Sequence, residues 1–434
     1  MAPPETSSRL PSCDAYFDAI QSKKKLPHSL QECLTSAFAG IPVSSFPEVP
    51  GGKVIEIPGD TPIVEAVRIL SEHNIMTAPV IRHDDGESST NWGDRYIGII
   101  DYAAVILWVL ENAELAAIAL SAGSATTTGV GEGAAGPIGT AALGATGSAA
   151  VSGLTSAVGA AVGGGAAIEK GTGKDSLSVD QHLGDNFYKV LREEPFSSTT
   201  VKSIMESYRW SPFLPVGLES SMLIVMLLLS KYRLRSIPVV ESGKSHVKNF
   251  ITQTAVVRGL QQCGGRDWFD CIAAYSLSDL GLPFMSSEEV ISIKGDNLVL
   301  EAFKRMKENH IGGLPVIQGS RRKIIGSLSI RDIRVLLLKP DLLTNLGHLT
   351  VMDFLKNLES VAEQPVTCSP NASLGSVIDS LASKSVQRIY VVEEEEGEIV
   401  GVITLRDVIS CFIFEPRYVF DKYFGCALKE LQNR

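Results

Sequence analysis

Residues 296–332 decide the fold, with the sequence DNLVLEAFKRMKENHIGGLPVIQGSRRKIIGSLSIRD. Asp296 is a good helix N-cap. After it, apolar residues recur at the three- and four-residue spacing of one helix face, at Leu298, Ala302, Phe303 and Met306. Two short runs, Pro315-Val-Ile and Gly326-Ser-Leu-Ser-Ile, flank a polar turn and predict a pair of strands. A further helix is predicted over 331–338.

The same pattern occurs four times along the chain. In each copy a polar residue lies 19 positions before a proline or tyrosine (60→79, 219→238, 296→315 and 371→390). The next strand follows that residue at a distance of 11 in three copies (238→249, 315→326, 390→401) and 19 in the first (79→98), where residues 83–94 lengthen the turn. Asp60, Asp296 and Asn371 are good helix N-caps, and Glu219 is a poorer one. Each copy is predicted to be a strand-helix-strand-strand-helix unit of about 55–60 residues.

These copies divide the chain into repeats at 51–115, 186–275, 280–342 and 350–425. Residues 1–50 are rich in proline and serine, so they are predicted to be a flexible N-terminal segment apart from a short helix at 30–38. Residues 116–185 are predicted to be a low-complexity insertion. Within 121–170 lie 13 of the 39 glycines and 14 alanines, a composition that buries little surface for the entropy lost on ordering.

Composition excludes several classes of protein. The chain has 434 residues, a formal net charge of −10 and a sequence pI near 5.3, which argues against a nucleic-acid binder with a basic face. Seven cysteines without a Cys-x-x-Cys pair predict reduced thiols in the cytoplasm or the nucleus, and no metal site. The apolar runs at 103–110 and 222–229 are far shorter than the ~20 residues that span a bilayer. We therefore predict buried helices there and no membrane span.

The sequence also contains no catalytic constellation. It has no Gly-x-Ser-x-Gly elbow, His-Glu-x-x-His pair, Walker loop or kinase signature, and its seven histidines are scattered. The repeats leave no stretch of roughly 100 residues that could form a separate catalytic domain. The chain is therefore predicted not to be an enzyme.

The repeats resemble cystathionine-β-synthase (CBS) domains, which typically end their strand pair with a Ser/Thr-x-x-Asp sequence. Four such units resemble the gamma subunits of AMP-activated and sucrose-non-fermenting-type protein kinases. The stretches most similar to the plant-type gamma subunit are Ile41-Pro-Val-Ser-Ser-Phe-Pro, Arg95-Tyr-Ile-Gly-Ile-Ile, Arg209-Trp-Ser-Pro-Phe-Leu, Ser230-Lys-Tyr-Arg-Leu-Arg-Ser-Ile-Pro-Val-Val and Ile311-Gly-Gly-Leu-Pro-Val-Ile. The resemblance covers about 40–110 and 185–425. It implies an α/β (α+β) fold in which four CBS repeats pair into two modules that form a disk.

The resemblance also implies a ribose site in the clefts between paired repeats, because the aspartate of the closing motif can accept bonds from both ribose hydroxyls. Two repeats carry the motif, as Ser329-Ile-Arg-Asp332 and Thr404-Leu-Arg-Asp407. The equivalent positions in repeats one and two are Ala104 and Ala255, so these clefts lack that carboxylate. Asp332 and Asp407 are also explained as helix N-terminal acids that the helix dipole stabilises, and both roles are compatible.

Phosphate groups need cations, which in the family lie two to four positions before the proline position. Arg235, His310 and Arg388 are the candidates, and the planar fork of Arg388 suits phosphate oxygens best. Alternatively, Arg235 belongs to a solvated helix end and His310 is a surface residue. Repeat one has Met76 where a family arginine would lie, so about half of the family's phosphate cluster is missing. Arg331 and Arg406 occupy matching positions and meet either phosphate or surface acids.

The resemblance therefore implies a non-catalytic regulatory gamma subunit of a heterotrimeric Ser/Thr kinase complex, with a catalytic alpha subunit and a scaffolding beta subunit as partners. An adenine nucleotide (AMP, ADP or ATP) is the implied ligand, with no covalent cofactor, and it would link energy and carbohydrate status to kinase signalling. Residues 40–57 are the candidate for pairing with the beta subunit by β-strand addition. The alternative is a stand-alone CBS-domain regulator that binds an adenosyl ligand and acts on another enzyme.

Overall fold

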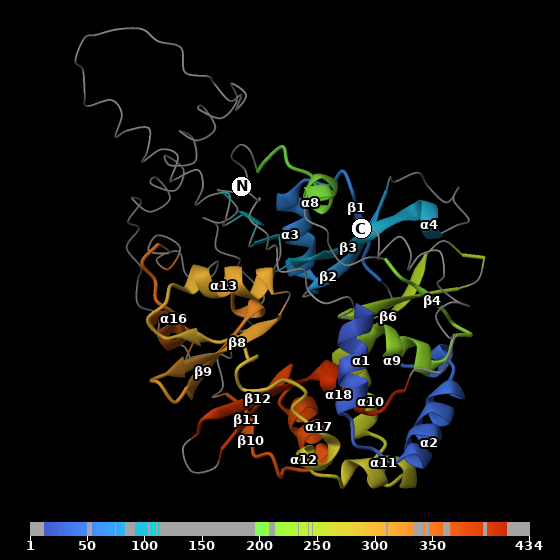
Figure 1. Ribbon diagram of the computed structural model, residues 1–434. Helices are drawn as coiled ribbons and strands as arrows, with labels where there is room; N and C mark the ends of the chain where they lie inside the picture. Colours follow the sequence, from blue (N-terminus) through green and yellow to red (C-terminus); the bar gives the residue numbers. More distant parts are fainter. Residues whose placement is uncertain are drawn as a thin grey trace, which may run out of the picture.

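The computed structural model (Figure 1) describes residues 13–49, 54–73, 75–82, 92–102, 196–207, 213–232, 234–241, 243–244, 246–309, 311–333, 347–358, 365–393 and 397–414, together with residues 105, 106, 108, 109, 112, 335 and 342. Each repeat has one three-stranded sheet, in which a short first strand pairs in parallel with the second and the second pairs antiparallel with the third. The predicted strand-helix-strand-strand order is confirmed in all four repeats. The insertion predicted at 116–185 lies outside the described residues.

The elements of the repeats follow in chain order. Repeat one has β1 (Ile57–Pro58), α3 (Ile63–Glu72), β2 (Thr77–Ile81), α4 (Trp92–Arg95) and β3 (Tyr96–Asp101). Repeat two has β4 (Val216–Gly217), α9 (Met222–Lys231), β5 (Ser236–Val240), β6 (Val247–Thr252) and α10 (Gln253–Gln261). Repeat three has β7 (Ile293–Lys294), α13 (Val299–Glu308), β8 (Gly313–Gln318), β9 (Lys323–Ser329) and the 3-10 turn η2 (Ile330–Asp332). Repeat four has β10 (Thr367–Cys368), α17 (Leu374–Ser383), β11 (Arg388–Val392), β12 (Ile399–Thr404) and α18 (Leu405–Cys411).

Strand register is the same in all four repeats. The proline or tyrosine identified from the 19-residue spacing lies opposite the third residue from the end of the partner strand, in the pairs Pro79↔Ile99, Pro238↔Phe250, Pro315↔Ser327 and Tyr390↔Val402. Each hairpin also has a register shift near the far end of its second strand. The sequence spacing therefore reports a conserved geometry within the molecule, because one displaced residue would reverse every side chain across the sheet.

The first helix of each repeat starts later than the sequence predicts. Asp60, Asp296 and Asn371 are not N-caps: they lie in the preceding turn, and the helix N-cap comes two residues on, at Pro62, Leu298 and Ser373. Of these three, Ser373 caps its helix through its side chain. Aspartate and asparagine suit both turns and N-caps, and so the residue type by itself did not separate the two positions.

The backbone N–H at the start of the first helix of each repeat bonds to a segment that precedes the first strand of another repeat. The N–H of Ile63 in repeat one donates to the Thr199 carbonyl, which lies in repeat two before β4, at 3.1 Å. Reciprocally, Met222 in repeat two donates to Ile41, before repeat one, at 2.8 Å. Repeats three and four make the same exchange. The N–H of Val299 in repeat three donates to the carbonyl of Leu349, before repeat four, and the N–H of Leu374 in repeat four donates to the carbonyl of Tyr275, before repeat three, both at 2.9 Å. These crossed segments pair repeat one with two and repeat three with four.

The packing divides into sheet contacts within a module and helix contacts between modules. Sheet residues of repeats one and two share a core that includes Ile81 and Val240, and those of repeats three and four share one that includes Ile317 and Tyr390. Helices of repeats two and four form the largest core, while helices of repeats one and three form another. Each repeat thus contacts two neighbours, which closes the four into a ring. Every fully buried aliphatic side chain in these cores contributes about 1.5–3 kcal/mol.

Helix α9 accounts for the apolar run at 222–229. All ten of its residues are buried, against α18 on one side and the N-terminal helices on the other. The prediction of a buried helix in repeat two is therefore confirmed. None of the helices in the described part of the chain has both the length and the hydropathy needed to cross a membrane.

The N-terminal segment is only partly as predicted. Residues 13–39 form α1 (Cys13–Lys23) and α2 (His28–Ala39), which pack against α9 and beside α11 (Asp267–Ala273), as the blue helices in Figure 1 show. The short helix predicted at 30–38 is confirmed as part of α2, whereas α1 replaces a stretch predicted to be flexible. Phe17 and Ile20 on α1, and Leu34 and Phe38 on α2, are buried in the core of repeats two and four. The overall proline and serine content concealed the pair on α1, although it lies at helical spacing.

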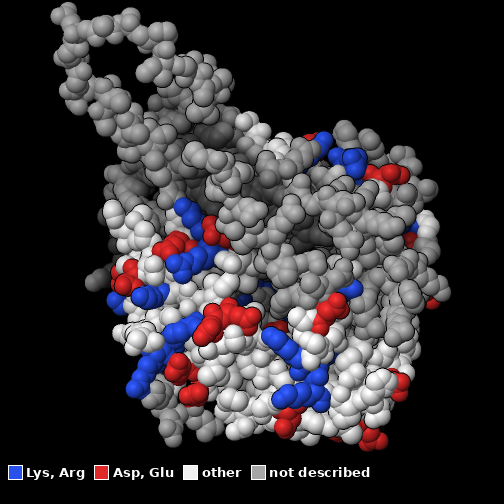
Figure 2. All heavy atoms as spheres, in the orientation of Figure 1, with Lys and Arg blue, Asp and Glu red and all other residues white. Residues whose placement is uncertain are grey.

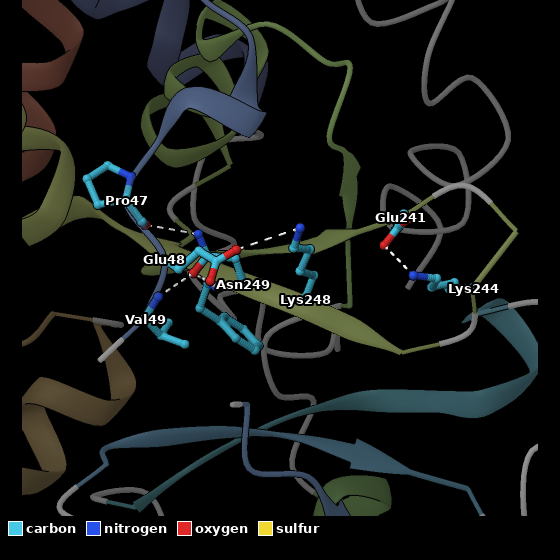
Figure 3. Close-up of polar contacts among 8 residues, drawn as sticks. Pro47, Glu48, Val49, Glu241, Lys244, Lys248 and Asn249 are labelled. Carbon is cyan, nitrogen blue, oxygen red and sulfur yellow. Dashed lines mark hydrogen bonds and ion pairs between the residues drawn. The ribbon is translucent and has the colours of Figure 1, made fainter. Parts of the chain in front are cut away.

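Residues 41–49 lie along repeat two. Val43 in the 3-10 turn η1 (Val43–Ser45) donates to Ser220, and the side-chain amide of Asn249 on β6 bonds both the Pro47 carbonyl, at 3.0 Å, and the Val49 N–H, at 2.9 Å (Figure 3). In the same view Glu48 lies 3.6 Å from Lys248. The first part of the segment predicted to pair with another subunit is therefore bound to its own chain.

Candidate ligand-binding site

One cavity collects residues from all four repeats. It has a volume of about 640 Å³, within the range of small-molecule sites. Repeat one contributes Thr77, repeat two Ser236, repeat three Pro315 and repeat four Val402, each from a strand of its sheet. The stretch of repeat three that precedes β7, called the linker because it leads from one module into the other, adds an apolar wall of Met285, Val290 and Ile291. The cavity therefore lies where the two modules meet.

The charge of this lining is opposite to that of the chain. Five arginines line the cavity, at positions 235, 258, 331, 388 and 406, against two aspartates, Asp101 and Asp407. The chain as a whole carries a formal net charge of −10. On the outer face drawn in Figure 2, basic and acidic side chains are interspersed. A local excess of guanidinium groups in a concave, partly apolar site favours an anionic ligand.

Asp407 lines the cavity at the start of α18. Its Oδ2 accepts hydrogen bonds from the Thr404 N–H at 2.8 Å and the Thr404 hydroxyl at 2.7 Å, and its own N–H donates to that hydroxyl oxygen at 3.4 Å. These bonds form a capping box, so the alternative prediction of a helix N-terminal acid describes the geometry correctly. Asp407 is 8% exposed, and burial raises its pKa while the bonds from Thr404 oppose the rise.

Asp332 forms the same arrangement in repeat three. The Ser329 N–H donates to its Oδ2 at 2.7 Å, and η2 has a capping box of the same type. Burial raises the pKa of Asp332, and the bond from Ser329 and the charge of Arg388 oppose that rise. The residues between the two, Ile330 and Arg331, line the cavity, whereas Ser329 and Asp332 do not. The two aspartates are thus equivalent in local structure but not in access to the cavity.

Arg388 begins β11 and lies over two glycines of repeat three. A Cβ at Gly313 would overlap the Arg388 guanidinium and would lie 2.7 Å from the Leu328 carbonyl oxygen. Gly312 and Gly313 therefore provide the space that the guanidinium occupies. This contact crosses from repeat four to repeat three and places a planar donor group on the cavity wall.

Arg235 also lines the cavity, and it is not part of a helix end. Helix α9 ends at Lys231, and Arg235 directly precedes β5. Its Nη1 lies 2.9 Å from Oδ2 of Asp101, at the end of β3 in repeat one. The structure thus brings Arg235, Arg388, Thr404 and Asp407 together at one cavity, while His310 lies outside the described residues.

Repeat two retains the cap but not the carboxylate. Thr252 accepts a hydrogen bond from the N–H of Ala255 at 3.1 Å, at the place where repeat four has Thr404 and Asp407. The register supports this equivalence, because Ser236↔Thr252 and Arg388↔Thr404 are matching pairs. Ala104 in repeat one lies outside the described residues.

Several cavity residues escaped the sequence analysis. Asp101, Gly312 and Gly313 belong to no recognisable binding motif. The apolar wall of the linker is held in place by an arginine more than 30 positions further along the chain. Arg322, in the turn between β8 and β9, donates to the carbonyls of Ser287 and Val290, the latter at 2.7 Å. These contacts hold the apolar linker against repeat three. Only spatial proximity relates these residues, and so no local sequence pattern could have identified them.

The described residues contain no group of three or more His, Cys, Asp or Glu side chains that is arranged to hold a metal ion. Five cysteines are free thiols: Cys33, Cys263, Cys271, Cys368 and Cys411. Burial raises the pKa of Cys411 to about 12, which keeps this thiol protonated at neutral pH.

Three segments of the chain match the CBS domain family: residues 48–111, 278–339 and 351–413. These segments correspond to repeats one, three and four. Repeat two lies between the first and second of these segments, and its strands have the same order and register as those of the other three repeats. Its turn lacks the aspartate that closes repeats three and four.

Two Arabidopsis thaliana proteins are similar to this chain over nearly its whole length. One, named SNF1-related protein kinase regulatory subunit gamma-1-like, is 59% identical over 99% of this chain and 98% of its own length. The other, SNF1-related protein kinase regulatory subunit gamma-1, is 34% identical over 95% and 91%. A crystal structure of a Methanocaldococcus jannaschii protein, described as an archaeal homologue of the AMPK gamma subunit, is 15% identical and has a TM-score of 0.49 over 83% of this chain and 97% of that one.

Proposed function

This chain belongs to the family of SNF1-related protein kinase regulatory gamma subunits, and from this premise we propose that it binds an adenine nucleotide in its central cavity. The bound nucleotide, AMP, ADP or ATP, acts as a regulatory ligand of a heterotrimeric Ser/Thr kinase complex. In that complex the chain is the non-catalytic member, beside a catalytic alpha subunit and a scaffolding beta subunit. It links energy and carbohydrate status to kinase signalling in the cytoplasm or the nucleus.

The observation that carries this proposal is the charge of the cavity. Five arginines and two aspartates surround a space of about 640 Å³ in a chain with net charge −10. Guanidinium groups offer several donors to phosphate oxygens, and the apolar linker wall suits a flat base. The composition of the lining thus supports a ligand with both an anionic and an aromatic part.

We assign the ribose contact to Asp407 rather than to Asp332. All bonds that the described residues give to the Asp407 carboxylate reach Oδ2, which leaves Oδ1 for a ligand hydroxyl. Asp407 lines the cavity, whereas Asp332 has the same local cap but no place in the lining.

Calorimetry with AMP, ADP and ATP tests the assignment. We expect Asp407→Asn to weaken nucleotide binding by roughly tenfold or more, since a charged hydrogen-bonding partner is lost. Asp353→Asn is the matched control. Asp353 has the same capping contact, 2.8 Å from the Thr350 hydroxyl, at the start of α16 (Val351–Leu358) and away from the cavity. Equal affinity in the Asp407 and Asp353 variants would contradict the ribose assignment, and absence of nucleotide binding by the unmodified chain would contradict the proposal.

Membership of a kinase complex needs a separate experiment. The chain should co-purify from its native tissue with a kinase catalytic chain and a scaffolding chain. Residues 41–49 already bind repeat two, which directs attention to the following residues as the part that pairs with the beta subunit. Recovery of the chain without any kinase subunit would instead favour the stand-alone regulator.

A further inference from the structure

The ion pair between Arg235 and Asp101 stands out within the cavity. Arg235 is the more accessible of the two, since its side chain is 50% exposed and that of Asp101 is 16% exposed. The Arg235 Nη1 lies 2.9 Å from Asp101 Oδ2, and both residues line the cavity. One of the cavity's cations is therefore bound by a carboxylate of the same chain, in a place that an anionic ligand can reach.

Asp101 occupies a position that has a different residue type in the other repeats. It pairs with Thr77 at the end of the β2–β3 hairpin. The same register position holds Thr252, Ser329 and Thr404 in repeats two, three and four. In those three repeats a hydroxyl caps the following turn. Repeat one thus has a full negative charge where the others have a neutral cap.

The second guanidinium edge of Arg235 faces the other module. A Cβ built on Gly312 would lie 3.9 Å from Arg235 Nη2 and 3.1 Å from Arg388 Nη2. The two guanidinium groups, one from each module, therefore approach the same point of repeat three. Two positively charged guanidinium groups that approach one point repel each other, so a bound anion between Arg235 and Arg388 is favoured.

We propose that Asp101 is a built-in competitor for the anionic part of the ligand. Its carboxylate occupies Arg235 in the ligand-free chain, and a phosphate group takes over Arg235 together with Arg388 when the ligand binds. This inference rests on the proposed nucleotide function and specifies how it is tuned. The exchange makes binding depend on the charge of the ligand, and it releases Asp101 of repeat one when the cavity fills.

Energetics make the exchange feasible. The Arg235 side of the pair is half-exposed, so solvent screens the contact in part, although the Asp101 side chain is largely buried. A bidentate contact between Arg235 and a phosphate group replaces the bond that Arg235 gives up. Neutralising Asp101 should therefore increase affinity. We expect Asp101→Asn to bind ATP and inorganic tripolyphosphate roughly three- to tenfold more tightly at low salt. The gain should shrink as salt is raised.

The test compares four full-length variants by calorimetry with ATP and sodium tripolyphosphate. Glu72→Gln is the matched control, because it also removes one negative charge and one arginine partner, Arg68, but on the outer face of α3. Arg235→Gln alone and combined with Asp101→Asn complete a double-mutant cycle. We expect the gain from Asp101→Asn to vanish in the Arg235→Gln background and to be absent in Glu72→Gln.

Unchanged or weaker binding by a folded Asp101→Asn chain would overturn the inference, and so would an equal gain in Glu72→Gln. If Asp101→Asn does not fold, Asp101→Ser replaces it, because repeat three has Ser329 at this register position. The proposed function fails separately: in that case the unmodified chain binds no nucleotide, whereas failure of the inference alone leaves nucleotide binding intact and insensitive to Asp101.

Discussion

The two modules share one strand register but end their hairpins differently. Repeats three and four close with a hydroxyl residue and an aspartate three positions later, which together form a capping box. Repeat two keeps the hydroxyl at Thr252 and has Ala255 in place of the aspartate, and repeat one has Asp101 at the hydroxyl position. The fold therefore tolerates different residues at this turn, because the sheets and cores that position it are built elsewhere.

The residues that build the scaffold differ from those that give the cavity its chemistry. Apolar spacing and register recur in all four repeats, whereas the charged groups of the cavity differ from repeat to repeat. Consequently, a change in one turn residue should alter ligand binding more than folding. Changes to the contacts that hold a turn in place should affect both properties.

The largest expected effect concerns the C-terminal end of α18 in repeat four. Lys24, next to the end of α1, donates from Nζ to the carbonyls of Ser410 and Ile413, at 2.7 and 2.5 Å, and lies over the Phe414 ring. Burial lowers the pKa of Lys24 to about 7. Repeat four is thus tied to the N-terminal helices by a buried amine that titrates near neutral pH.

The sign of the resulting pH dependence follows from this lowered pKa. Between pH about 7 and 10.5 the unfolded chain binds the Lys24 proton and the folded chain does not, so the free energy of unfolding rises with pH by up to about 1.4 kcal/mol per unit. Below pH 7 Lys24 is protonated in both the folded and the unfolded chain, so the stability gained between pH 7 and 10.5 is absent there. Urea denaturation of the native chain and of Lys24→Met should show the extra slope in the native chain alone. The exposed Lys25→Met is the control, and equal slopes in all three chains would contradict the prediction.

The second prediction concerns the contact between Arg388 of repeat four and Gly313 of repeat three. Gly313→Ala places a Cβ within the Arg388 guanidinium and 2.7 Å from the Leu328 carbonyl oxygen, so strand and side chain must both shift. We expect a loss of about 1–3 kcal/mol in the free energy of unfolding, together with weaker binding of ATP. Gly264→Ala is the control, since its added Cβ would lie at an ordinary 3.7 Å from its nearest neighbour, the Gln261 carbonyl oxygen. Wild-type stability and affinity in Gly313→Ala would show that Arg388 moves without cost.

The smallest effect is expected from a substitution that gives repeat two the turn of repeat four. Ala255→Asp adds the missing carboxylate three residues after Thr252, where the Ala255 N–H already bonds the threonine hydroxyl at 3.1 Å. Completing the capping box should stabilise the chain by roughly 0.5–1 kcal/mol in chemical denaturation. Ala255→Asn keeps the size of the side chain but removes its charge. A loss of stability in the aspartate variant would mean that the turn of repeat two differs from that of repeat four beyond this one residue.

Much of the scaffold was predictable from the sequence because apolar periodicity is local. The 19-residue spacing identified four hairpins with one register, and the apolar run of α9 identified a buried helix. The helix starts at Asp60, Asp296 and Asn371 were wrong by two residues, because such side chains serve turns as well as caps. The short helix at 30–38 was predicted and is part of α2, but α1 was missed because the average composition outweighed its buried pair of Phe17 and Ile20.

The candidate site was only partly predictable. The motif around Thr404 and Asp407 follows from the sequence, but its equivalence to Ser329 and Asp332 concealed a difference in access to the cavity. The partner of Arg235 lies 134 positions away, and the glycines beneath Arg388 belong to another repeat. Such relations depend on how separate repeats pack, which residue spacing does not encode.

The repeat, its strand register and the chemical groups available at each turn follow from the sequence, since these depend on neighbours within one unit. Which of these groups meet depends on how the repeats pack. Reciprocal backbone bonds pair the repeats into modules, and helix cores join the modules into a ring. That closure brings Arg235 to Asp101, Arg388 to Gly313 and Asp407 to a shared cavity, because only packing between distant segments can create a charged site of this kind.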